Sequence, residues 1–145
     1  MLSREIMTEN PEVVLASDSL EEAARRMRDL DVGVMPVVED RDGRRLEGVI
    51  TDRDIVVRHV AEGHGAGCKV EEAMSRDGMV TVGPEDDVEL VASRMSQSQV
   101  RRVPVVESGR LVGIIAQADL AIDASDDRLV GATVEAISAP GRPER

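Results

Sequence analysis

The segment Thr51-Asp-Arg-Asp54 carries side chains well suited to ligand chemistry in this 145-residue chain. It follows the apolar run Gly48-Val-Ile, so we expect a strand to end where a helix begins at Thr51. The Thr51 hydroxyl and the first backbone N–H groups of such a helix suit a phosphate, because free N–H groups and the helix dipole attract an anion. The Asp54 carboxylate has two oxygens that can accept from both hydroxyls of a ribose diol.

These residues also have a purely structural interpretation. Thr and Asp are enriched at helix N-termini, where they cap unpaired N–H groups, so Thr51 and Asp54 can serve only to start a helix. The basic pair Arg101-Arg102 can likewise be two solvated arginines. The residues taken alone leave both interpretations open.

The chain shows no arrangement typical of a metal site or an active site. His59, His64 and Cys68 offer three metal ligands, but their spacing matches no recognised zinc pattern and they fall in a glycine-containing connector. No nucleophile–base pair, P-loop or dinucleotide-type glycine fingerprint occurs. We therefore expect neither a bound metal nor an enzyme.

Composition and charge restrict the possible partners. The formal net charge of −11 opposes nucleic-acid binding, which depends on neutralising phosphates with Lys and Arg. The chain lacks Phe, Tyr and Trp, so single-stranded bases have nothing to stack on and the core must be aliphatic. A local basic pair can still hold one small anion, because a cleft focuses local charge. Nucleic acid is therefore not an expected partner.

The sequence favours a cytoplasmic location. Cys68 is the single cysteine, so no disulfide can form within the chain. The first ten residues do not resemble a signal peptide, and no apolar run approaches membrane-spanning length. No membrane partner is expected.

Internal repetition predicts the architecture. Three blocks recur in the same order at offsets of 65 to 68 residues. They are 6–8 with 73–75, 32–38 with 100–106, and 48–54 with 113–119. The offset falls because the turn at 39–44 is longer than its counterpart at 107–110.

Within each copy the hydrophobic period alternates between that of a helix and that of a strand. Apolar residues at helical spacing predict helices around 20–30 and 88–95, and each copy should have a second helix, at 52–61 and 117–124. Short β-branched runs joined by turns predict hairpins of 34–38 with 46–50 and of 103–106 with 111–115, and further short strands are expected at 13–15 and 80–82.

The expected fold is mixed α/β (α+β): two tandem βαββα repeats packed sheet to sheet. One copy of about 60 residues is near the lower limit for independent stability, so the two copies should pack together. The expected divisions are a first domain at 1–62, a connector at 63–69, a second domain at 70–125 and a partly flexible C-terminal extension at 126–145.

The combined blocks resemble tandem cystathionine-β-synthase (CBS) domains, also called Bateman modules. The resemblance covers roughly residues 3 to 124 and is closest to stand-alone bacterial or archaeal pairs. It implies two domains related by a pseudo-two-fold axis, a homodimer of such modules, and clefts between paired domains that bind AMP, ADP, ATP or other adenosine-containing ligands.

The resemblance further implies that each cleft is composite. Asp54 of the first copy would face the second copy, where Val80 provides an apolar wall for adenine and Arg101-Arg102 hold phosphate oxygens. The expected nucleotide-binding residues are Thr51, Arg53, Asp54, Val80, Arg101, Arg102, Val103 and Pro104.

A second, weaker cleft would pair Asp119 with the first copy. Ala116 replaces the hydroxyl residue there, and Glu12 occupies the position that matches Val80. A carboxylate buried there without a partner would cost several kcal/mol, so we expect only the Asp54 cleft to bind nucleotide well. The residues of the weaker cleft are Asp119, Gly33, Val34 and Met35.

These features predict a non-catalytic regulatory module. It would bind an adenine nucleotide (AMP, ADP or ATP) as a regulatory ligand, with no required cofactor, and signal in trans to an unknown protein partner. The alternative is a ligand-free CBS-fold dimeric scaffold or stress-response interaction protein, which the degraded second cleft favours.

Overall fold

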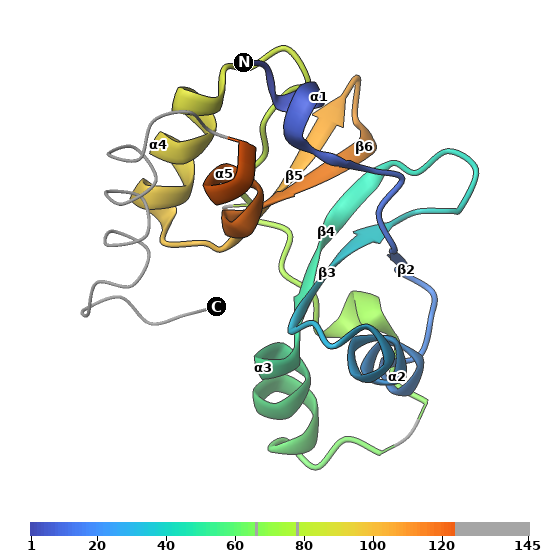
Figure 1. The fold of residues 1–145 in the computed structure, drawn as a ribbon. Coiled ribbons are helices and arrows are strands. Elements are labelled where there is room, and N and C mark those ends of the chain that lie inside the picture. Colours follow the sequence, from blue (N-terminus) through green and yellow to red (C-terminus); the bar gives the residue numbers. More distant parts are fainter. Residues whose placement is uncertain (66, 78, 124–145) are drawn as a thin grey trace. The chain divides into compact units, whose positions relative to one another are not determined.

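The computed structural model describes residues 1–65, 67–77 and 79–123, with side chains described as far as Leu120. The chain forms two compact units. The central unit consists of the described residues of 12–79, and the outer unit combines residues 1–11 with the described residues from Val80 to Asp123; the units are named for their places in the sequence. Figure 1 shows the elements of both units in sequence colours.

The central unit has the predicted βαββα order. Strand β3 runs antiparallel to β4 and parallel to the short β2, giving the sheet order β2-β3-β4. The elements are β2 (Val14–Leu15), α2 (Leu20–Leu30), β3 (Val34–Val38), β4 (Leu46–Thr51), α3 (Asp52–Ile55), the π-helix η1 (Val56–Val60) and the 3₁₀-helix η2 (Val70–Glu72).

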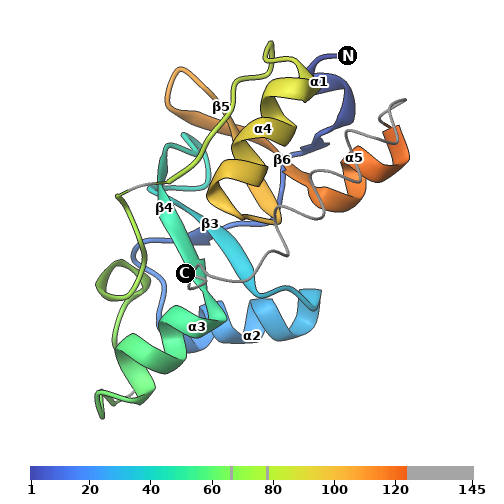
Figure 2. The same ribbon diagram turned by 90° about the vertical axis from the view of Figure 1, so that its left-hand side faces the viewer.

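The outer unit repeats this arrangement with one strand from the N-terminus. Its sheet order is β1-β6-β5, and Val82 adds a single parallel bridge to Val105 in place of the predicted strand at 80–82. Figure 2 shows α4 lying over β5 in this unit. The elements are α1 (Ser3–Ile6), β1 (Thr8–Glu9), α4 (Val88–Ser98), β5 (Arg102–Glu107), β6 (Arg110–Ala116) and α5 (Gln117–Asp123).

The mixed α/β class and the two copies are confirmed, and the hairpins and first helices lie within a few residues of their predicted bounds. The helix predicted at 52–61 differs in kind, because it widens to a π-helix after Ile55. The predicted extension at 126–145 lies outside the described residues. Within the described part of the chain, no helix has the length and apolar character that crossing a membrane requires.

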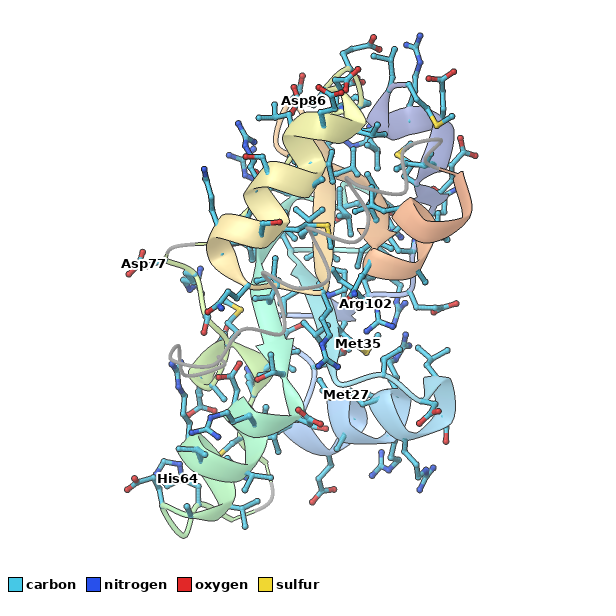
Figure 3. All side chains as sticks on the ribbon, turned by 60° about the vertical axis from the view of Figure 1, so that its left-hand side comes forward. Met27, Met35, His64, Asp77, Asp86 and Arg102 are labelled. Atoms are coloured by element: carbon cyan, nitrogen blue, oxygen red, sulfur yellow. The ribbon has the colours of Figure 1, made fainter. Side chains whose placement is uncertain are left out.

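Each unit has its own aliphatic core. In the central unit, Met27 of α2 and Met35 of β3 are buried together with Ile50 and Val14 (Figure 3). In the outer unit, Met95 of α4 is buried with apolar residues of β5 and β6. Methionine has a flexible side chain that fills irregular gaps, and here it takes the volume that aromatic residues often supply.

The leading segment of each copy packs into the unit formed by the rest of the other copy. Thr8 and Glu9, in the leading segment of the first copy, pair with Ile114 and Gly113 of β6. Ser75, in the leading segment of the second copy, forms an antiparallel bridge with Val49 of β4. The two copies have therefore exchanged equivalent leading segments.

Candidate functional site

Thr51 and Asp54 form a reciprocal hydrogen-bonded box at the start of α3. The Asp54 N–H donates to the Thr51 hydroxyl at 3.0 Å, and the Thr51 N–H donates to the Asp54 carboxylate, also at 3.0 Å. Such a capping box satisfies two backbone donors at once, so the structural role foreseen for these residues is present. Asp54 is only 5% exposed.

The first N–H groups of α3 are already paired. Asp52 N–H donates to the carbonyl oxygen of Gly33 at 2.9 Å, and Arg53 N–H donates to the Asp52 carboxylate at 2.8 Å. With the Asp54 N–H held by Thr51, the helix start does not offer the free N–H groups that we expected for a phosphate. A phosphate here would have to displace the exposed Asp52 carboxylate.

Arg58 is a neighbour of Asp54 that the sequence did not lead us to expect. Its Nε lies 3.7 Å from the Asp54 carboxylate, and its side chain is half exposed. The two residues are four apart on one helix, a spacing that brings side chains together and could have indicated the pair. The contact is long for a hydrogen bond, so Asp54 keeps acceptor capacity toward a ligand.

Loss of the Thr51 hydroxyl should destabilise the central unit modestly. We expect Thr51→Ala to lower the free energy of unfolding by about 1 kcal/mol, because the Asp54 N–H loses its cap. Urea unfolding followed by circular dichroism measures the change. Thr51→Ser keeps the hydroxyl and should stay near wild type; equal losses in both variants would show that the hydroxyl is not the stabilising group.

The basic half of the predicted site lies in the outer unit, at the start of β5. Arg101 is exposed and Arg102 is half-buried, whereas Val103 and Pro104 are buried in the sheet. The Val82 N–H donates to the Pro104 carbonyl oxygen at 3.1 Å, which fixes the segment that follows Val80 beside β5. The segment that follows Val80 and the start of β5, with Arg102 and Pro104, therefore lie side by side in this unit.

In each copy an arginine side chain donates a hydrogen bond to the backbone of the segment in which we predicted the first strand. The sequence did not lead us to expect these two hydrogen bonds. Arg94 of α4 donates to the Thr81 carbonyl oxygen at 2.6 Å, and Arg26 of α2 donates to the Val13 carbonyl oxygen at 3.0 Å. The two arginines are 68 residues apart, as are their acceptors. Recurrence at this offset is the signal that could have identified them.

The half-site at Asp119 retains part of the same geometry. The Ala116 N–H donates to the Asp119 carboxylate at 2.7 Å, and the Gln117 N–H donates to the Arg101 carbonyl oxygen at 2.8 Å, matching the bonds of Thr51 and Asp52. Ala116 has no hydroxyl to accept from the Asp119 N–H. The box is therefore half formed in the second copy.

Comparison with known proteins explains why the same hydrogen bonds occur in both copies. The family described as "CBS domain" matches twice, over residues 3–59 and 70–123. The chain belongs to the CBS domain family. Two similar curated proteins, each 36% identical, are the CBS domain-containing protein YhcV of Bacillus subtilis, over 93% of this chain and 94% of its own, and hypoxic response protein 1 of Mycobacterium tuberculosis, over 95% and 94%.

Solved CBS structures have the same fold. Hypoxic Response Protein I, whose crystal structure has two coordinated zinc ions, is 36% identical with a TM-score of 0.74 over 84% of this chain and 98% of its own. CBSX2 in complex with AMP is 25% identical, with a TM-score of 0.72 over 85% and 95%. The CBS domain pair of MJ0100 with 5'-methylthioadenosine and S-adenosyl-L-methionine is 29% identical, with a TM-score of 0.69 over 84% and 98%. CBS domain proteins are generally regulatory rather than catalytic.

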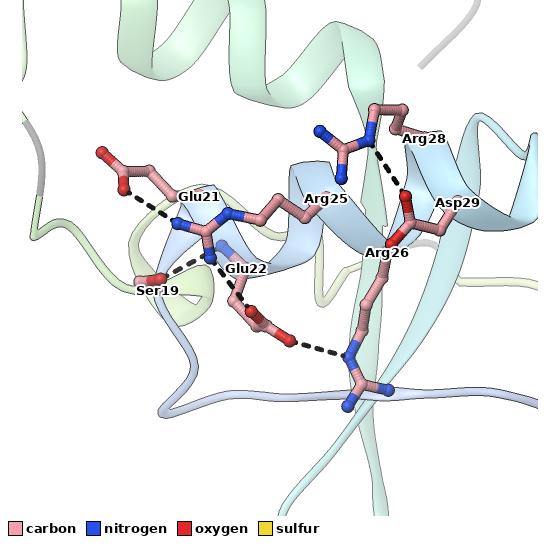
Figure 4. A network of polar contacts seen from close by, with 7 residues as sticks. All are labelled: Ser19, Glu21, Glu22, Arg25, Arg26, Arg28 and Asp29. Carbon is pink, nitrogen blue, oxygen red and sulfur yellow. Dashed lines mark hydrogen bonds and ion pairs between the residues drawn. The ribbon is translucent and has the colours of Figure 1, made fainter.

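Glu12 of the first CBS domain has a partner, contrary to our expectation. Its carboxylate lies 3.8 Å from Arg26, and Figure 4 shows Arg26 also bound to Glu22 on the same face of α2. Glu12 is well exposed, so this pair contributes little, on the order of 0–1 kcal/mol. The expectation that Glu12 has no partner is therefore wrong. The predicted weakness of the second site rests instead on Ala116, which stands where the first site has Thr51, and on Gly33-Val34, which stand where the first site has Arg101-Arg102.

Each of the two predicted clefts thus consists of two half-sites, and one half-site of each cleft lies in each unit. Thr51, Arg53 and Asp54 lie on one turn of the central unit, where Arg53 is exposed, and Gly33, Val34 and Met35 lie at the start of β3. The outer unit contains Asp119 and the half-site that includes Arg101 and Arg102.

His59, His64 and Cys68 come together in the central unit, although no metal site was expected there. One ligand atom of each lies within 4.8 Å of those of the other two. The imidazole rings of the two histidines have centroids 5.9 Å apart in an edge-on arrangement.

Proposed function

We propose that this chain is a regulatory CBS pair that binds an adenine nucleotide through Asp54 and Thr51 of one unit and Val80, Arg101 and Arg102 of the other. Its output acts on a partner protein in trans. The chain is not an enzyme, has a cytoplasmic location, and uses the nucleotide as a signal rather than a cofactor.

The observation that carries this proposal is the buried but incompletely paired carboxylate of Asp54. It accepts one backbone hydrogen bond and has a long contact with a half-exposed arginine. Buried carboxylates are normally fully hydrogen-bonded, because removal of their charge from water is costly. A ribose diol supplies two further donors, which suits the remaining acceptor capacity of this side chain.

The ligands of similar proteins support an adenosine moiety. The AMP of CBSX2 and the 5'-methylthioadenosine and S-adenosyl-L-methionine of MJ0100 share adenosine and differ in the group attached to the ribose. In this chain Arg101 and Arg102 favour a ligand that carries phosphate on the ribose, because guanidinium groups form charge-assisted bonds with phosphate oxygens. AMP, ADP and ATP are therefore preferred over the sulfur-containing adenosines.

A homodimer is part of this proposal. Three valines on η1 are strongly exposed, at 56% for Val56, 45% for Val57 and 62% for Val60. Association of two copies through this face would remove apolar surface from water, which is the main favourable term in protein association.

Calorimetric titration with AMP and with adenosine tests the proposed site. We expect Asp54→Asn to weaken both ligands by at least about 100-fold, since two hydrogen bonds to a charged group are worth roughly 3 kcal/mol or more. Replacing both Arg101 and Arg102 by Gln should weaken AMP but spare adenosine, which has no phosphate.

The matched control is Asp119→Asn in the weaker half-site, which should leave AMP affinity unchanged. Equal losses for Asp54→Asn and Asp119→Asn would contradict the inequality of the two sites. Unchanged AMP affinity in Asp54→Asn would remove the proposed site altogether.

A ligand-free scaffold is the second candidate, and the paired N–H groups at the start of α3 favour it. A thermal-shift screen with AMP, ADP, ATP and S-adenosyl-L-methionine separates the two functions, because a ligand that binds only the folded chain must raise its melting temperature. A melting temperature unaffected by every ligand would support the scaffold.

A further inference from the structure

The chain contains two histidines and one cysteine, and all three lie in one place. Their ligand atoms fall within 4.8 Å of one another, although the residues are spread over a ten-residue segment. Imidazole nitrogen and cysteine sulfur are the ligand types that Zn²⁺ prefers. Chance placement of every histidine and cysteine of a 145-residue chain in one cluster is improbable.

An unpaired buried nitrogen provides independent support for a ligand. His59 is 9% exposed, and its Nδ1 is buried without a hydrogen-bond partner among the described residues. Buried polar atoms without partners are rare in folded proteins, and each requires an explanation. A cation bound at Nδ1 would satisfy the nitrogen that the described residues leave unpaired.

Two of the three residues are held in place by the fold. His59 belongs to η1, and π-helical turns are rare and occur frequently at functional sites. The Cys68 carbonyl oxygen accepts from the Leu20 N–H at 2.9 Å, and the next residue, Lys69, bridges to Ser19 before α2. Both positions are therefore set by backbone contacts that do not require a metal.

The third residue can adjust to a cation. His64 is exposed and lies just beyond the end of η1, where its N–H donates to the His59 carbonyl oxygen at 3.1 Å (Figure 3). Ligand atoms around a tetrahedral zinc lie roughly 3.3–3.8 Å apart, given Zn–N and Zn–S lengths of about 2.1 and 2.3 Å. Rotation of the exposed His64 side chain can shorten the distances from its ligand atom to those of His59 and Cys68 to this range.

We propose that His59, His64 and Cys68 bind one zinc-type transition-metal cation, with its fourth position taken by water or another exchangeable ligand. The cation fastens the end of the helix that carries Asp54 to the segment that precedes η2. This proposal does not depend on nucleotide binding, since all three ligands belong to the central unit.

Cobalt substitution tests the site in the full chain. After treatment with a chelator, titration with Co²⁺ should give a sulfur-to-cobalt charge-transfer band and intense tetrahedral visible bands that saturate at one equivalent. Zn²⁺ should then abolish these bands by displacement. Cys68 is the single cysteine, so a thiolate band can arise only from it.

The variants His64→Ala and Cys68→Ser should each weaken Co²⁺ binding by more than about 100-fold, because even the loss of an outer partner of a ligand costs roughly 10–100-fold. Lys69→Ala changes a neighbouring exposed residue and should bind like wild type. Zn²⁺ should raise the melting temperature of wild type but not of Cys68→Ser.

Binding without a sulfur band, or with the same affinity in His64→Ala and Cys68→Ser as in wild type, would overturn the site and assign the metal to surface carboxylates. Both variants change groups that are not fully buried, and a circular dichroism spectrum of each variant checks that it remains folded. His59→Ala is less suitable as the first test, because it also removes a buried ring.

Discussion

Replacement of Gly48 by Val should lower the free energy of unfolding by about 3 kcal/mol. A Cβ at Gly48 would lie 2.5 Å from the Ser75 carbonyl oxygen, which is backbone and cannot rotate away. Ser75 also exchanges two backbone hydrogen bonds with Val49, of 3.0 and 2.9 Å. The added side chain must push this segment off the edge of β4, so steric strain and lost hydrogen bonds act together.

Urea unfolding followed by circular dichroism measures this effect, and Gly65→Val is its matched control. A Cβ at Gly65 meets nothing within 4 Å, and its backbone needs no positive φ. The control should therefore stay within about 0.5 kcal/mol of wild type, as surface substitutions generally do. Similar losses in both variants would mean that the contact with Ser75 is not what excludes a side chain at Gly48.

The same close approach occurs in the outer unit, and it shows why this glycine recurs in both copies. A Cβ at Gly113 would lie 3.0 Å from the Thr8 carbonyl oxygen and would overlap the Met7 side chain. In each unit a leading segment packs against the glycine of the second hairpin strand. Ser75 contacts Gly48 of β4, and Thr8 contacts Gly113 of β6. The sequence displays the repeated glycine, whereas the segment that it accommodates is visible only in the fold.

The hairpins were predictable because their information is local. Runs such as Val34–Val38 combine β-branched residues with a nearby turn, and both requirements are met within about 18 residues of sequence. The π-helical turn at Val56–Val60 is different, because it continues directly from α3 and no local signal marks the widening. Tertiary contacts decide such a feature.

The candidate site was predictable in its residue types but not in its hydrogen bonds. Thr51 and Asp54 were identified from their place after a strand, and the structure shows them bound to each other. The pairing of Arg53 N–H with the Asp52 side chain depends on a rotamer that the sequence does not specify. The cluster of His59 with Cys68 was missed because zinc patterns in sequence describe common spacings, whereas coordination depends only on distance in space.

Ile6→Ala should loosen the sheet of the second copy, although Ile6 belongs to the leading segment of the first copy in the sequence. Ile6 is 5% exposed and lies in the same core as Val103 and Ile115. Truncation of a buried Ile to Ala costs about 2–5 kcal/mol, depending on how well the site can collapse. The loss should fall on the outer unit, because the Ile6 side chain packs there.

Amide hydrogen exchange distinguishes this outcome from general destabilisation, since it reports local opening segment by segment. In Ile6→Ala the amides of β5 and β6 should lose protection more than those of β3 and β4. Val70→Ala is the reciprocal variant, because Val70 begins the second copy in the sequence but is fully buried in the core of the central unit. In Val70→Ala the amides of β3 and β4 should lose protection more than those of β5 and β6. If each variant instead loosened the rest of its own copy, the exchange of leading segments would be refuted, and the domains would follow the order of the chain.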